Sequence, residues 1–150
     1  LQKNPLFQTT IKKLMNIAHT HNCIRHNSLH FTTNSTAEMT KLFRNCFLAT
    51  KVAFCNEIFE LCEKKEIDYE NVRFLATLDD RITTSHSIVP GHDGRHGFGG
   101  TCFPKDMASL RHQIQTNDLQ SFIIDAAIKR NETIDRPEKD WTNDIGRASI

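Results

Sequence analysis

The spacing of apolar residues predicts several helices along the chain. In residues 8–22, apolar side chains recur every three or four positions, as on one face of an amphipathic helix. The stretch from Ser35 to about Glu66 contains neither glycine nor proline and keeps helical spacing throughout, and Ser35 and Glu38 form a possible capping box at its start. We therefore expect one helix of about 30 residues, a length that is unusual in globular domains and typical of a subdomain-spanning or interface helix.

Shorter elements flank this long helix. Residues 23–33 are predicted to be extended, as a strand whose partners are not in this chain, because a short strand alone is unstable. Further helices are predicted at residues 69–78 after a cap at Asp68, at residues 104–115, and from a cap at Asn117 or Asp118 to about Asp135. Residues 79–103 form a long irregular segment, and loops longer than about 12 to 15 residues are often functional. The predicted fold class is mainly helical.

Composition narrows the function classes. The chain has 150 residues, enough for one domain with a core, and its net charge is +1 with lysines and arginines spread along it, which argues against a nucleic-acid partner. No apolar run approaches the roughly 20 residues that span a bilayer and no signal peptide opens the chain, so we expect no membrane partner. Five cysteines without a C-x-x-C pair favour a reducing, cytoplasmic location, and the histidine spacings match no familiar zinc pattern, so no metal is expected.

Five of the six glycines lie within residues 91–100, and Cys102 follows them. Glycine is favoured where φ is positive or where a ligand approaches the main chain, so the cluster indicates a shaped loop. Pro104 suits the first turn of a helix, which places Cys102 beside a helix N-terminus, where the thiolate is favoured. Cys102 is thus a candidate nucleophile, with Lys105 and Asp106 on the same turn. A buried structural cysteine before a capped helix is the other interpretation, and spacing alone does not decide between them.

Two segments carry a resemblance: residues 37–57, with Lys41, Asn45 and the pair Asn56-Glu57, and the run Gly97-Phe98-Gly99-Gly100-Thr101-Cys102-Phe103-Pro104-Lys105-Asp106. Together with Asp80-Arg81-Ile82 and Pro90-Gly91, they closely resemble the UDP-glucose and GDP-mannose dehydrogenase family, strongly from about Ser35 to Leu110. The resemblance implies a helical central dimerisation domain of the 6-phosphogluconate dehydrogenase C-terminal-like type. It further implies three parts: residues 1–34 as the last helix and strand of an NAD-binding domain, residues 35–135 as the central domain, and residues 136–150 as a polar tail or linker.

Members of this family oxidise the C6 alcohol of a nucleotide sugar to a carboxylate with two NAD⁺. The resemblance implies UDP-glucose as substrate and a homodimer formed through the long helix, with GDP-mannose or a UDP-hexosamine as alternative substrates. No G-x-G-x-x-G follows a strand here, so most of the NAD site is expected in a domain outside these residues, and the chain alone should be inactive. The competing hypothesis is a stand-alone helical dimerisation or assembly module without activity.

The resemblance also assigns roles to residues. The catalytic set is Cys102, Lys41, Asn45 and Asp106; the substrate-binding set is Lys41, Asn45, Arg81, Phe98 and Gly99; and Cys102 and Lys105 adjoin the NAD cofactor. Cys102 would add to the aldehyde and form a thiohemiacetal, then a thioester that water hydrolyses. Lys41 and Asn45 share a helix face and can hold an oxyanion. Asp106 would position the hydrolytic water.

Some positions depart from the family pattern or allow a plainer interpretation. Arg81 would reach the substrate of the partner subunit, but as residue types Arg81, Lys41 and Asn45 are also ordinary solvated side chains. Thr83 stands where a glycine is common, His86 stands where many members carry an aromatic residue, and residues 92–96 lengthen the loop. These departures weaken any assignment of the sugar nucleotide and leave the cysteine chemistry untouched.

Overall fold

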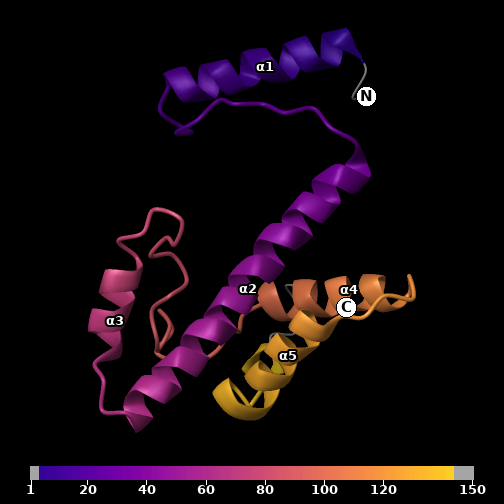
Figure 1. The fold of residues 1–150 in the computed structure, drawn as a ribbon. Coiled ribbons are helices and arrows are strands. Elements are labelled where there is room, and N and C mark those ends of the chain that lie inside the picture. Colours follow the sequence, from indigo (N-terminus) through magenta and orange to yellow (C-terminus); the bar gives the residue numbers. More distant parts are fainter. Residues whose placement is uncertain (1–3, 144–150) are drawn as a thin grey trace. The chain divides into compact units, whose positions relative to one another are not determined.

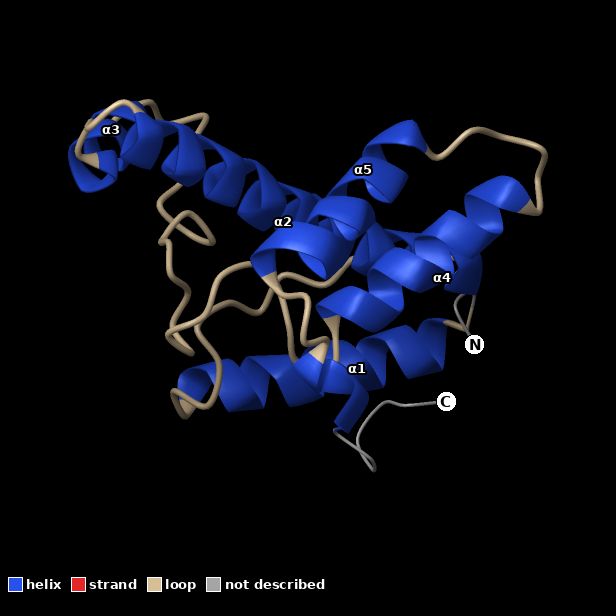
Figure 2. Ribbon diagram, turned by 90° about the horizontal axis from the view of Figure 1, so that it is seen from below, coloured by secondary structure: helices blue, strands red, loops and turns tan. Residues whose placement is uncertain are grey.

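The computed structural model describes residues 4–143, and all regular secondary structure in that range is helical (Figure 2). The chain divides into two compact units, residues 1–41 and residues 42–150. Figure 1 labels the helices. None of the helices in residues 4–143 is long and apolar enough to cross a membrane. The helical fold class expected from the sequence is confirmed.

The first unit contains α1 (Pro5–Thr20) and the start of α2 (Asn34–Lys64). The carboxamide oxygen of Asn4 caps α1 by accepting hydrogen bonds from the second and third helical amides, at 3.0 and 3.2 Å. At the start of α2, the hydroxyl oxygen of Thr33 accepts a hydrogen bond from the Thr36 N–H at 3.1 Å. The capping residue is therefore Thr33, and the capping box predicted at Ser35 is wrong because Ser35 already lies inside the helix.

The strand predicted at residues 23–33 is not formed. These residues have no regular secondary structure, and the described chain contains no strand that could pair with them. A single extended segment cannot satisfy its backbone hydrogen bonds as a ladder, which explains the difference. The edge-to-face contact of Phe7 with Phe31, whose ring centroids lie 6.4 Å apart, packs this segment against α1.

The second unit continues α2 to Lys64 and adds three helices and two short segments: α3 (Tyr69–Ala76), α4 (Phe103–Gln115), α5 (Phe122–Arg130), the π-helical η1 (Asn131–Asp135) and the 3₁₀ segment η2 (Asp140–Asn143). The long helix and the Asp68 cap of α3 are confirmed, since Asp68 Oδ1 accepts from the Glu70 N–H at 2.9 Å. The cap predicted at Asn117 or Asp118 is wrong, because α5 starts after Ser121. Asp118 adopts φ 57° in the turn that ends α4.

Two apolar clusters hold the second unit together along α2. The first cluster brings α2, the glycine-rich loop, α4 and α5 together through Cys46, Ala49, Ala53, Phe98, Met107, Ala127 and Ile128. The second cluster joins the C-terminal half of α2 to α3 and to the segment just before the glycine-rich loop. Its buried members are Cys55, Cys62, Tyr69 and Val89. Small residues on α2 allow close packing at the first cluster. The glycine-rich loop is therefore anchored in the core by Phe98.

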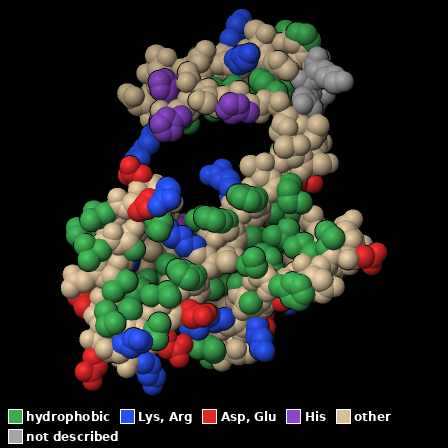
Figure 3. Space-filling view, in the orientation of Figure 1, with side chains coloured by type: hydrophobic (Ala, Val, Ile, Leu, Met, Phe, Trp, Pro, Cys, Tyr) green, Lys and Arg blue, Asp and Glu red, His purple; other side chains and the backbone are tan. Residues whose placement is uncertain are grey.

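Many large apolar side chains of the second unit remain exposed. Figure 3 shows hydrophobic side chains gathered over one face of this unit. On α2 the exposed members are Phe43, Phe47, Phe54 and Leu61, each at least half exposed. An apolar surface of this kind marks a region where another surface packs.

Candidate active site

Asp106 is the buried polar centre of the second unit. Its side chain is 2% exposed and lies on the first turn of α4. One carboxylate oxygen accepts a hydrogen bond from Asn45 Nδ2 on α2 at 2.6 Å, and the other accepts from Lys105 Nζ at 2.6 Å. Hydrogen bonds to a charged group are stronger than neutral ones, so this pair of donors satisfies a carboxylate that burial would otherwise penalise. The arrangement ties α2 to the start of α4.

Cys102 occupies the N-cap position of α4 and is exposed. Its thiol makes no capping hydrogen bond, while its backbone oxygen accepts from the Asp106 N–H at 2.9 Å. The thiol therefore stands at the positive end of the helix, four residues before Asp106. Cys102 is therefore not a buried structural cysteine, and its reactivity stays a prediction.

Cys46 shows the opposite environment. It is buried on α2, and its thiol donates a hydrogen bond to the Asp106 backbone oxygen at 3.3 Å. Burial, with a smaller contribution from the Asp106 charge, raises the pKa of Cys46 to about 11. Cys46 therefore stays a neutral thiol at neutral pH and serves as packing. The two cysteines near Asp106 thus differ in their access to solvent.

Phe98 packs the glycine-rich loop against the core. The Phe98 side chain is buried in the first cluster and meets the Phe103 ring edge-on at a centroid distance of 6.5 Å. The resemblance places Phe98 beside the sugar, but its side chain lies in the core and both of its main-chain polar groups are paired with the Asn131 carboxamide. His86 packs its ring 5.5 Å from that of Phe103, so an aromatic ring is kept at this departure from the family pattern. Burial lowers the pKa of His86, aided by the charges of Lys51 and His92.

The remaining predicted site residues lie elsewhere. The Arg81 side chain is 88% exposed and pairs with Asp79 at 2.6 Å within its own loop. Lys41 precedes Asn45 by four positions on α2 and falls in the first unit. The structure thus brings together Asn45, Lys105 and Asp106 and places Cys102 on the same helix start.

Sequence reasoning assigned no role to three residues that hold the glycine-rich loop: Asn56, which it quoted only as part of the resemblance, and Asn131 and Arg136, which it did not single out. All three are buried polar side chains. Their partners on the loop are largely backbone atoms, which have no residue-specific pattern. A buried polar residue late in the chain gives no local signal of such a contact, so only the assembled unit reveals it.

The comparisons with known proteins decide the family. Residues 35–133 match the UDP-glucose/GDP-mannose dehydrogenase family, central domain. The chain belongs to this family. The match covers Asn45, the glycine-rich loop, Cys102 and Asp106, and ends before Arg136.

Relatives include UDP-glucose 6-dehydrogenases from three bacteria. The chain is 43% identical to that of Rickettsia bellii over 97 residues, which are 65% of this chain and 21% of the relative. It is 38% identical to that of Rhizobium meliloti over 104 residues (69% and 23%), and 41% identical to that of Pseudomonas aeruginosa over 95 residues (63% and 20%). The chain therefore spans about a fifth of the length of the curated relatives it matches.

The described residues supply little of a cofactor or metal site. Lys105, which the resemblance places near the cofactor, has its ammonium on Asp106, and no strand precedes the glycine-rich loop in residues 4–143. Across the same residues no group of three or more His, Cys, Asp or Glu side chains is arranged to hold a metal ion. A dinucleotide would therefore need groups beyond those described.

Proposed function

We propose that this chain is the nucleophile-bearing central domain of an NAD-dependent nucleotide-sugar 6-dehydrogenase. The observation that carries the proposal is the helix start of α4, where exposed Cys102 stands one turn before a buried Asp106 held by Asn45 and Lys105. We divide the chain into three parts: residues 1–34 are the end of an NAD-binding domain, residues 35–135 form the central domain, and residues 136–150 are a polar tail or a linker to a further domain. UDP-glucose is the proposed substrate because the relatives above are named UDP-glucose 6-dehydrogenases.

The chemistry of these residues suits the second half of a two-step oxidation. The Cys102 sulfur adds to the carbon of a C6 aldehyde, and the aldehyde oxygen takes a proton, giving a thiohemiacetal. Loss of a hydride from that carbon and of the proton from its hydroxyl leaves a thioester; water then attacks the carbonyl carbon and the C–S bond breaks, which releases the carboxylate and a proton and restores the thiol. In this scheme Asp106 would orient that water, while Asn45 and Lys41 would hold the oxyanion. NAD⁺ would accept the hydrides of both oxidations.

The test uses the longer enzyme that contains this segment, with Cys102→Ser compared with Cys23→Ser. Both cysteines are exposed, so the control removes an accessible thiol of the same kind. We expect Cys102→Ser to lose at least about a hundredfold in carboxylate formation, the scale of loss of a catalytic group, while Cys23→Ser keeps wild-type turnover. Mass spectrometry of the wild type mixed with the UDP-sugar aldehyde should show an adduct on Cys102. Full carboxylate formation by Cys102→Ser would refute the proposal.

The alternative function is an assembly module without turnover. The placement of Cys102 argues against it, because a purely structural module has no use for an exposed thiol at a helix start. GDP-mannose and a UDP-hexosamine stay as alternative substrates, and parallel assays with the three nucleotide sugars separate them. The five free cysteines agree with the proposed cytoplasmic location.

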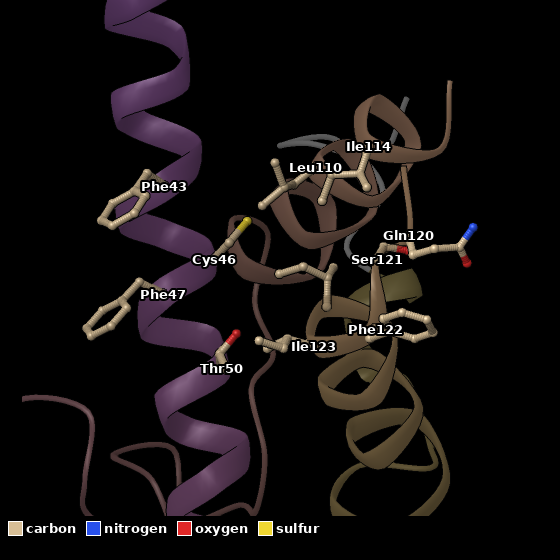
Figure 4. Close-up of a pocket in the computed structure, with 11 residues that line it drawn as sticks. Phe43, Cys46, Phe47, Thr50, Leu110, Ile114, Gln120, Ser121, Phe122 and Ile123 are labelled. Carbon is tan, nitrogen blue, oxygen red and sulfur yellow. The ribbon is translucent and has the colours of Figure 1, made fainter. Parts of the chain in front are cut away.

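We also propose that α2 forms a homodimer with a second copy of this chain. Its exposed apolar side chains Phe43, Phe47, Phe54 and Leu61 follow one another at steps of four, seven and seven residues. A seven-residue repeat keeps an apolar seam facing another helix of the same period, which favours a second α2 as partner. Beside this seam an apolar groove of about 470 Å³ runs between α2, α4 and α5. Figure 4 shows Cys46 and Thr50 on the α2 side of it and Leu110, Ile114 and Ile123 opposite.

Light scattering at micromolar concentrations tests the dimer. The double variant Phe47→Glu/Phe54→Glu should shift the mass from dimer to monomer, because four buried carboxylates would face one another across the seam. Phe74→Glu on α3 is the matched control, since Phe74 is equally exposed but off this helix, and it should leave the dimer intact. A monomeric wild type would refute the proposal, and so would equal dissociation by the control.

A further inference from the structure

The segment after α5 holds the glycine-rich loop by its backbone. The Asn131 side chain, fully buried at the start of η1, accepts a hydrogen bond from the Phe98 N–H at 2.7 Å through Oδ1. Its Nδ2 donates to the Phe98 carbonyl oxygen at 2.9 Å. The carboxamide thus pairs with both polar groups of one residue, as a neighbouring strand would. The orientation of the Phe98 backbone is fixed as a result.

Gly97 is held from a second direction. Its N–H donates to Asn56 Oδ1 on α2 at 3.2 Å. Its φ is +67°, and a Cβ built there would overlap the Asn131 carboxamide and lie 2.8 Å from Asp135 Cβ. The loop therefore passes between α2 and η1 with no room for a side chain, and only glycine fits.

Arg136 covers the loop at Gly99. A Cβ on Gly99 would lie 2.5 Å from the Arg136 Cζ atom and 2.7 and 2.8 Å from Nη1 and Nε, so the planar guanidinium covers that glycine. Arg136 is 3% exposed, and its charge is satisfied by Asp140, at 2.7 and 2.9 Å, and by Asp93. Hydrogen bonding from Arg136 lowers the pKa of Asp140. A buried guanidinium with two carboxylates is a rigid group.

The Asn131 hydrogen bonds and the Arg136 ion pair with Asp93 together form a clamp on the glycine-rich loop, and part of this clamp lies outside the matched residues 35–133. Asp93 belongs to residues 92–96, which lengthen the loop, and Arg136 lies beyond the matched residues 35–133. Arg95 in the same loop pairs with Glu138 and Asp140 at 3.2 and 2.8 Å. The lengthened loop is thus bound to the segment that follows η1.

We infer that Asn131 and Arg136 are positioning residues that fix the glycine-rich loop and thereby set the place of the Cys102 thiol at the start of α4. Only Gly100 and Thr101 separate Gly99 from Cys102. Phe98 before and Phe103 after this short link are packed against each other. The thiol therefore follows the loop backbone. The importance of this positioning for catalysis rests on the proposed role of Cys102. The labelling experiment that tests the positioning does not depend on that role.

The cysteines of the chain supply the measurement. Iodoacetamide labels exposed thiols, and mass spectrometry of the peptides gives the rate at Cys102 relative to Cys23 in the same tube. Labelling of the three buried cysteines, Cys46, Cys55 and Cys62, reports any global opening. Three variants are compared with wild type: Arg136→Met, Arg136→Lys and the control Arg130→Met. Arg130 carries similar ion pairs, to Asp135 and Glu60, from the end of α5.

Arg136→Met should lower the Cys102 to Cys23 rate ratio about threefold, the size of effect that a helix N-terminus has on an adjacent anion, with the buried cysteines still unlabelled. Arg136→Lys should recover the urea midpoint toward wild type, because it keeps a charge for Asp93 and Asp140. It should leave Cys102 slow, because it lacks the planar group over Gly99. Arg130→Met should lower the midpoint without changing the ratio.

An unchanged ratio in folded Arg136→Met overturns the inference, as does an equal fall in Arg130→Met. If Arg136→Met unfolds enough for its buried cysteines to be labelled, the test rests on Arg136→Lys. A wild-type ratio of Cys102 to Cys23 labelling in Arg136→Lys then overturns the inference. Because no turnover is measured, the result is separate from the Cys102→Ser assay. If turnover does not need Cys102, the proposed function is refuted, while the positioning of the loop by Asn131 and Arg136 is not.

Discussion

The hydrogen bond from Asn45 to Asp106 allows a sharp test of what burial adds to a polar contact. We expect Asn45→Ala to lower the free energy of unfolding by about 1.5 to 3 kcal/mol, the range for a hydrogen bond to a charged group. The upper part of that range applies because the Asp106 side chain is 2% exposed, so water cannot replace the lost donor. Lys105 still donates to the other oxygen, which keeps the loss below that of an unpaired buried charge.

The chain contains a matched control. Asn71 Nδ2 donates to Asp68 Oδ2 at 2.8 Å, the same pair of groups as Asn45 Nδ2 and Asp106 Oδ2 at 2.6 Å, but on an exposed helix start. Asn71→Ala should reduce the free energy of unfolding by only about 0.2 to 0.5 kcal/mol, as for other exposed pairs on helices. Urea unfolding followed by circular dichroism measures both variants. Equal losses, or a loss below about 0.5 kcal/mol for Asn45→Ala, would refute the reasoning.

Two further predictions concern the loop and the core. Gly97→Ala should destabilise the chain by about 1 to 3 kcal/mol more than Gly94→Ala. Both glycines have positive φ, but a Cβ at Gly97 would meet Asn131, whereas a Cβ at Gly94 would meet nothing within 4 Å. Equal urea midpoints of the two variants would contradict this. The pKa of Cys46 is raised from 9.0 to about 11, so the unfolded chain loses the thiol proton first. The contribution of Cys46 to the free energy of unfolding should therefore be complete below pH 9.0 and should be lost between pH 9.0 and about pH 11. In Cys46→Ala the urea midpoint should fall less steeply over this pH range. A decline as steep in the variant would count against it.

Much of the helical fold could be predicted because its causes are local. The long uninterrupted stretch of α2 and the Asp68 cap of α3 depend on neighbours within one helical turn. The predicted caps at Ser35 and Asp118 failed for a related reason. Thr33 offers an equivalent hydroxyl two positions earlier, and Asp118 adopts a left-handed conformation to end α4. Several polar residues compete for each cap, and packing chooses between them.

The candidate site divides along the same line. The sequence by itself determined that Cys102 follows a glycine loop and precedes a helix, since Pro104 and the glycines act on their own backbone. Tertiary structure alone decided that Cys102 is exposed while Cys46 is buried, and that Asn45 meets Asp106 across 61 positions of sequence. Backbone preferences act over a few residues, whereas burial and polar pairing depend on which distant segments share the core.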